Sequence, residues 1–314
     1  MDKKKMTIAN FNIVFGEKEE PLLNYFSDIV MPAFHSPFVR SKGDCDYIIM
    51  NIRVIEVEEK DYVLTGIIVK KTNLEIFSKF DNENNLIETN ELYPTAPFSL
   101  FTIYLKNHRM VLVKNQKGSP DLRNFSATIR YILDRYVREE NIIRKKDQQT
   151  ELPYAIVNIV GIPMRESIED ALKKVSKINK LILKFYPLNG DLDFSDLFEG
   201  MTTELRKKVG SKTGALTLNT PTSVGGITEI LTAAQGTVEP IFKVTYPDKK
   251  TGRIYNGALS ENMEISYVDT NNIEEAVAQI ASKTKEIDSL KNVSDDNKRI
   301  YEVNETNIIP FLKK

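Results

Sequence analysis

Basic side chains in three clusters are the residues of this sequence whose types and spacing offer chemistry. Residues 101–146 hold eleven Lys and Arg against four acids, and residues 201–253 hold eight against four, in a chain of net charge −1. A patch of one sign in a nearly neutral protein attracts polyanions without making the whole surface adhesive. We therefore expect contacts with phosphate groups. The candidate residues are Arg123, Arg130 and Arg138; Arg206, Lys207, Lys208 and Lys212; and Lys249, Lys250 and Arg253.

The clusters also have a plainer interpretation. Charge that is concentrated along a chain need not form a patch in space, and a row of arginines on an amphipathic helix is often only a solubilising face. Basic residues at the tip of a hairpin are commonly solvated as well. Both interpretations stay open at the level of sequence.

Residue sets that would indicate an enzyme are incomplete. His35 and His108 lack metal-ligand spacing and a nearby Glu partner, and a single Cys45 cannot form an internal disulfide or a zinc cage. The run Gly210 to Thr213 resembles a phosphate loop, but Ser211 separates Gly from Lys, so Gly210 fits a helix C-cap better.

Two acidic patterns fail in the same way. The acids Asp191, Asp193, Asp196 and Glu199 lack the spacing of a calcium loop, and Asp193 is better interpreted as a helix N-cap. A nuclease-like arrangement of Asp46, Glu58 and Lys60 can also be read as a plain hairpin turn. The sequence thus predicts no catalytic residue, no metal and no cofactor, and it favours a role other than catalysis.

The elements that would position the basic clusters follow from periodicity. Residues 121–140 predict an amphipathic helix with Arg123, Arg130 and Arg138 turned to solvent. Residues 240–246 and 253–259 predict a hairpin whose tip, PDKKTGR, carries the third cluster. The Arg206 cluster falls at the end of a helix predicted over 193–209, followed by Gly210.

The predicted fold class is α+β, with two mixed domains. Residues 1–150 predict an N-terminal antiparallel sheet with packed helices, including hairpins 46–57/62–69 and 98–106/110–114. Residues 151–292 predict an α/β domain with a βαβ unit formed by strand 154–160, helix 167–176 and strand 180–186. Residues 80–91 predict a loop or an exposed hairpin end, 141–151 a linker and 293–314 a polar tail.

Composition and length agree with folded domains. The 314 residues are 41% hydrophobic and 28% charged, which suffices for two cores of ordinary size. No apolar run approaches the ~20 residues that span a bilayer. We therefore expect a cytoplasmic protein without direct membrane insertion.

One stretch resembles a known family. The run YPTAPFSLFTIYLKNHRMVLVKN, the helix that follows it, and PYAIVNIVGI with its βαβ-like continuation resemble the phage-exclusion RexA-like proteins in hydrophobic pattern and element order over about residues 93–260. That resemblance implies a dimeric DNA-binding component of bacterial abortive defence, without a catalytic centre of its own. It transfers no residue roles, because no motif matches residue by residue.

The sequence therefore favours a nucleic-acid-binding protein, with duplex DNA preferred to RNA and with contacts to phosphates, in a phage-defence or stress-response setting. We expect nucleic acid as the partner, together with a homodimer and a partner effector protein. The alternatives are a regulatory module that binds an acidic protein, and a nuclease-like enzyme with an unrecognised site.

Overall fold

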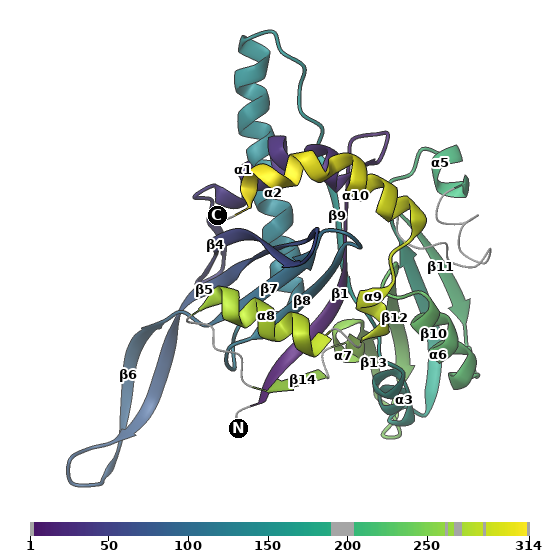
Figure 1. The fold of residues 1–314 in the computed structure, drawn as a ribbon. Helices are drawn as coiled ribbons and strands as arrows, with labels where there is room; N and C mark the ends of the chain where they lie inside the picture. Colours follow the sequence, from purple (N-terminus) through teal and green to yellow (C-terminus); the bar gives the residue numbers. More distant parts are fainter. Residues whose placement is uncertain (1–2, 190–203, 261–262, 267–271, 285–286, 313–314) are drawn as a thin grey trace.

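The computed structural model of the chain describes residues 3–189, 204–260, 263–266, 272–284 and 287–312, which form two antiparallel sheets with helices on their faces (Figure 1). The predicted α+β class is confirmed. The larger sheet has the order β14-β1-β8-β7-β5-β4-β3, with β2 and β9 paired to β1 and β6 paired to β5. Its strands are β1 (Lys3–Phe15), β2 (Glu20–Pro21), β3 (Arg40–Lys42), β4 (Cys45–Glu58), β5 (Asp61–Phe80), β6 (Leu86–Thr95), β7 (Phe98–Tyr104), β8 (Arg109–Lys114), β9 (Ala155–Gly161) and β14 (Met263–Ser266). Both hairpins predicted in the first half, β4–β5 and β7–β8, are confirmed.

Helices cover both faces of this sheet, because the strands alternate apolar side chains between them. Along β1, Phe11 and Ile13 join one core, and Met6 and Ile8 join the other. The first core is completed by η1 (Leu22–Tyr25), η2 (Phe26–Val30), α1 (Met31–His35), α2 (Leu122–Lys146), α10 (Asp295–Ile308) and η4 (Ile309–Phe311). The second core is completed by α8 (Ile273–Thr284) and α9 (Asp288–Lys291).

Helix α2 begins where the sequence predicts and ends later. The Asp121 carboxylate caps it by accepting from the backbone N–H of Asn124 at 2.8 Å. Residues 141–146, predicted as part of a linker, continue the helix, so that prediction was wrong. The reason is a tertiary contact: the buried Asn141 side chain exchanges two hydrogen bonds with the backbone of Leu152, at 2.7 and 2.9 Å.

The distal halves of β5 and β6 project from the body as a two-stranded arm (Figure 1). The predicted exposed hairpin end near residue 80 is confirmed. The arm carries exposed apolar side chains, among them Leu74, Phe77, Phe80 and Leu86.

The second sheet has the order β11-β10-β12-β13, formed by β10 (Lys177–Phe185), β11 (Gly214–Asn219), β12 (Val238–Thr245) and β13 (Thr251–Tyr255). The helices α3 (Arg165–Lys173) and α6 (Val224–Ala233) pack on one of its faces, and α5 (Arg206–Lys208) and α7 (Gly257–Ser260) lie beside it. The predicted βαβ unit is wrong. Its first strand, β9, pairs antiparallel with β1 of the larger sheet, and its second, β10, lies between two antiparallel neighbours of the second sheet. Hydrophobic period identifies a strand but not its partner.

Elements from both sides of residue 150 build the larger sheet and its cores. Strand β9 pairs with β1 over seven residues. Within the predicted tail, α10 places Tyr301 and Ile308 in the first core. In the described ranges, no helix is long and apolar enough to cross a membrane.

Candidate nucleic-acid interface

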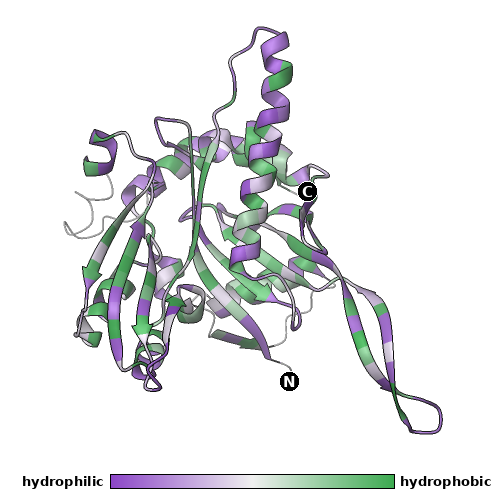
Figure 2. Cartoon of the chain, turned by 180° about the vertical axis from the view of Figure 1, so that it is seen from behind, coloured by the Kyte–Doolittle hydropathy of each residue, from purple (hydrophilic) through white to green (hydrophobic). Residues whose placement is uncertain are grey.

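The second sheet leaves one face open. Leu181, Phe242 and Ile254 point into the core under α3 and α6. Because successive side chains of a strand alternate between faces, the residues next to them point the other way. Figure 2 shows this open face, with the strands in front of the helices.

Three cations stand in register across the open face. Lys180 on β10 is the Cα partner of Lys243 on β12, and Lys243 is in turn the partner of Arg253 on β13. Asn219 of β11 extends this line on the other side of Lys180. With strands about 4.8 Å apart, the three cations span roughly 10 Å. We call Lys180, Lys243 and Arg253 the cation row.

The cation row costs stability. Like charges directly opposite each other on neighbouring strands repel. In the part of the chain that the structure describes, no carboxylate forms an ion pair with any of the three. Four residues further along β10, on the same face, Lys184 does have an acidic partner, because it forms an ion pair with Glu239 of β12 at 3.8 Å. An anion placed over the row would remove the repulsion.

The next register line is uncharged. Ile182 of β10 faces Ile241 of β12, which faces Tyr255 of β13. The Tyr255 side chain remains 51% exposed. The open face therefore combines cations with an aromatic ring on which a base could stack.

The tip of the β12–β13 hairpin extends the basic surface beyond the sheet. Lys249 and Lys250 are exposed there, as the sequence predicts. Lys250 lies 3.1 Å from the Asp248 carboxylate, which offsets part of its charge. Arg253, the third residue of the predicted tip cluster, belongs to the cation row, so the tip lysines continue that row.

The predicted arginines of α2 are exposed, which confirms their outward orientation. Arg130 also donates to the backbone carbonyl of Val157 at 2.8 Å. Burial raises the pKa of the Asp134 carboxyl, against the lowering effect of Arg130 and Arg138 on either side. Arg123 and Arg138 project from the same helix, one before and one after Arg130.

Arg130 lies close enough to the end of β10 to influence a side chain there. Its charge acts on Tyr186, which follows β10 and donates its hydroxyl to Glu239 at 3.1 Å. Burial and the Glu239 carboxylate raise the pKa of Tyr186 to about 12, while Arg130 opposes the shift. In Figure 2, α2 and the open face lie on the same side of the molecule. Two of the three predicted clusters therefore flank one surface.

The Arg206 cluster, predicted to contact phosphates, does not belong to this surface. Arg206 is buried at 4% exposure and holds the Glu19 carboxylate through both terminal nitrogens, one at 2.7 Å. Arg206 is therefore a structural ion-pair residue and not a phosphate contact, since its charge is already compensated inside the protein. Lys207 lies 3.8 Å from the same carboxylate.

Lys208 and Lys212 are exposed, but they lie at the far end of the second sheet. Gly214, two residues after Lys212, is in register with Phe185 at one end of β10, whereas the tip residues follow Thr245, the partner of Lys177 at the other end. Eight residues of strand separate the two ends by about 27 Å. A ligand must be long to reach both.

A family model described as a domain of unknown function, DUF4747, matches residues 4–223. The chain belongs to this family. The DUF4747 match includes α2 and Lys180 and ends at Ser223, which caps α6, so Lys243 and Arg253 lie after it. A comparison with curated proteins finds no match.

The nuclease-like pattern of the DUF4747 chain is not assembled by the fold. In the register of β4 and β5, Asp46 lies opposite Lys71 and Glu58 lies opposite Asp61. The two acids of the nuclease-like pattern therefore lie at opposite ends of β4. Within the described residues no group of three His, Cys, Asp or Glu could hold a metal ion. The acids at 191–199 lie outside those residues.

The phosphate-loop candidate follows a helix end, as predicted. The Gly210 backbone is left-handed, with φ 67°, and its N–H donates to the Lys207 carbonyl at 3.0 Å.

Sequence reasoning missed Lys180 and Lys243. Alternation along a strand places Lys180 and Lys184, four residues apart, on one face. It could not indicate that Lys180 would face Lys243, because the partner strand lies far along the chain.

Proposed function

We propose that this DUF4747 protein binds nucleic acid through its phosphate backbone, with the open face of the second sheet as the contact surface and α2 at its side. The observation that carries the proposal is the cation row, because three opposed cations cost stability that a phosphate backbone would restore. The tip lysines and the exposed α2 arginines would extend the contact along the same side.

The proposed ligand is DNA. Duplex DNA, which the sequence favours, remains a proposed ligand. Tyr255 adds a stacking surface that only an unpaired base can use, worth about 1–3 kcal/mol for each stacked base. We therefore expect single-stranded DNA to bind at least as well as a duplex of the same length.

The cellular setting is part of the proposal. The resemblance to RexA-like proteins supports a phage-defence role, with a homodimer and a partner effector protein. Cells that carry the gene should resist a phage that plates normally on cells without it, and alanine at Lys180, Lys243 and Arg253 should abolish the resistance.

Titration of labelled duplex DNA, single-stranded DNA and RNA at low salt tests the proposal. The variant with Lys180→Ala, Lys243→Ala and Arg253→Ala should bind roughly a hundredfold more weakly, at about 1 kcal/mol for each lost contact. Failure of all three nucleic acids to bind the unaltered chain would contradict the proposal and favour the acidic-protein partner.

A matched control removes the same charge elsewhere. Lys117, Lys298 and Arg299 are exposed and lie off the open face, and together they also comprise two lysines and one arginine. Their replacement by alanine should change the affinity less than threefold. An equal loss in both triple variants would mean that net charge, rather than the cation row, determines binding.

A further inference from the structure

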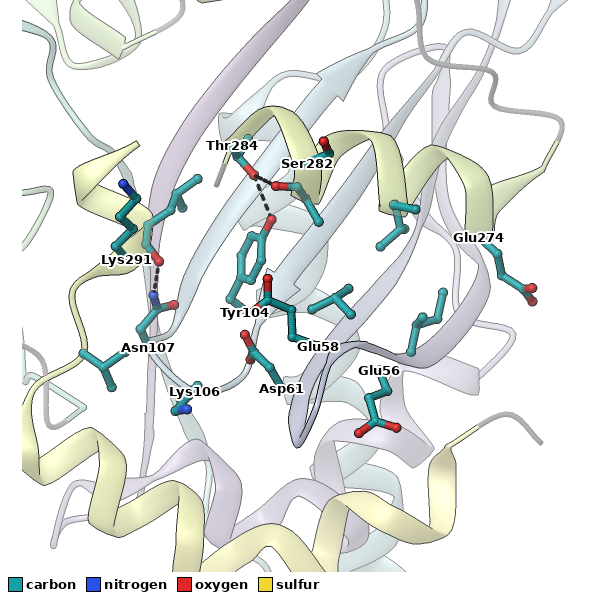
Figure 3. A pocket seen from close by; sticks show the side chains of 17 residues that line it. Glu56, Glu58, Asp61, Tyr104, Lys106, Asn107, Glu274, Ser282, Thr284 and Lys291 are labelled. Atoms are coloured by element: carbon teal, nitrogen blue, oxygen red, sulfur yellow. Dashed lines mark hydrogen bonds between the residues drawn. The ribbon is translucent and has the colours of Figure 1, made fainter. Parts of the chain in front are cut away.

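A cavity of about 630 Å³ lies on the opposite side of the larger sheet from α2. Its walls are the β4–β5 hairpin, the end of β7 and the inner face of α8, and α9 closes one end (Figure 3). A volume of this size is in the range that holds a small organic molecule.

Two carboxylates face each other at the cavity wall. Glu58 and Asp61 are Cα partners across the two-residue turn of the β4–β5 hairpin. Figure 3 shows both carboxylates directed to the same part of the cavity, below the Tyr104 ring. Like charges at directly opposed positions repel, so the two carboxylates make this part of the cavity wall negative.

Asp61 is the residue that points to a cationic ligand. Its Oδ1 atom is buried and, among the described residues, has no hydrogen-bond partner. Burial raises the pKa of Asp61, Lys106 opposes the shift, and Glu58 adds to it. Lys106 is close enough to act on Asp61 but forms no ion pair with it in the described structure, and the Lys291 amine lies beyond Asn107 (Figure 3).

Part of the remaining wall is apolar, and the elements that form it are held in place. Val57, Val277 and Ala281 line the cavity. Tyr104 and Thr284 hold α8 to the sheet through a hydroxyl–hydroxyl contact of 3.0 Å. Asn107 holds α9 by donating to the Leu290 carbonyl at 2.6 Å.

These features identify the class of ligand. Metal ions of the kind that carboxylates bind need more oxygen ligands than one opposed pair supplies. A hydrocarbon body would instead fill the apolar walls, while an ammonium group would satisfy the buried Asp61 oxygen. We propose that this cavity binds a small organic amine whose cationic group lies at Glu58 and Asp61 and whose apolar part lies against α8. The site is independent of the nucleic-acid interface.

Three probes of one shape test the proposal: phenylbutylamine, phenylbutanol and phenylbutyrate. The amine should bind the full chain at least tenfold more tightly than the alcohol, and the acid should bind more weakly than either. At a hundredfold excess over its Kd the amine should raise Tm by about 5 °C. Equal binding of amine and alcohol, or tightest binding of the acid, would overturn the proposal.

Two variants separate the charge from the walls. Asp61→Asn should weaken the amine about tenfold and leave the alcohol unchanged, whereas Glu274→Gln, a rim carboxylate paired with Arg53 at 3.0 Å, should change neither. Ala281→Phe should abolish binding of both probes by filling the cavity. Unchanged amine affinity in Asp61→Asn would contradict the assignment.

The cation-row alanine variant should bind the amine as the unaltered chain does. Failure of the nucleic-acid proposal would therefore leave this test intact.

Discussion

Lys180 and Lys243 lie directly opposite each other on β10 and β12, on the face of the second sheet that α3 and α6 do not cover. Arg253 follows on β13. A sheet that places three cations side by side gives up stability, and the proposed phosphate ligand accounts for that arrangement.

Replacing Lys243 by Glu should stabilise the folded chain while it weakens nucleic-acid binding. The new carboxylate would lie between Lys180 and Arg253 and turn two repulsions into attractions, a gain of about 1 kcal/mol in the free energy of unfolding. Urea denaturation at low salt measures the gain, which should shrink at 1 M salt because the Debye length falls to about 3 Å. Lys184→Glu, which would face Glu239, should instead destabilise the chain.

Glu19→Gln should destabilise the chain by about 3 kcal/mol, because it leaves the buried Arg206 guanidinium without its charge partner. The double variant Glu19→Met with Arg206→Met should lose less, since no buried charge remains. Denaturation of the three proteins provides the comparison, and nucleic-acid affinity should be the same in all. A weaker affinity for nucleic acid in the double variant would show that Arg206 contributes to the interface.

The α2 arginines should separate into two kinds. Arg138→Ala should leave the free energy of unfolding within about 0.5 kcal/mol. Arg130→Ala should cost about 1 kcal/mol, because it removes the hydrogen bond to the Val157 carbonyl. Both changes should weaken DNA binding. If a variant that lacks Arg123, Arg130 and Arg138 binds DNA normally, α2 is not part of the interface.

Asp61→Asn should stabilise the chain at neutral pH. The folded state raises the pKa of Asp61 above its ordinary 3.8, chiefly by burial, so the folded protein binds this proton more tightly than the unfolded chain does. Stability contributed by the protonated carboxyl is complete below 3.8 and is lost as pH rises through the folded value. The Tm difference between the variant and the unaltered chain should therefore be larger at pH 7 than at pH 3.5. A constant difference would show that Asp61 does not titrate abnormally.

Local patterns in the sequence were enough for the hairpins, for the start of α2 and for the orientation of its arginines, because alternation and helical period act over a few residues. They failed where distant residues decide the outcome. The buried Asn141 and Leu152 contact extends α2 through a predicted linker. Pairing with β1 takes β9 out of the predicted βαβ unit.

The same limit applies to the candidate site. Arg206 belongs to a basic run in the sequence, yet Glu19, from the start of the chain, compensates it inside the fold. The cation row appears only when β10, β12 and β13 are placed in register.

The salt dependence of DNA binding tests the central claim most directly. Each lost phosphate contact lowers the slope of log K against log salt by about 0.9 on duplex DNA and about 0.7 on a single strand. Alanine at Lys180, Lys243 and Arg253 should therefore reduce the slope by up to about 2.7 on the duplex and about 2.1 on the single strand. An unchanged slope in that variant would show that the cation row does not contact phosphates and would contradict the proposed function.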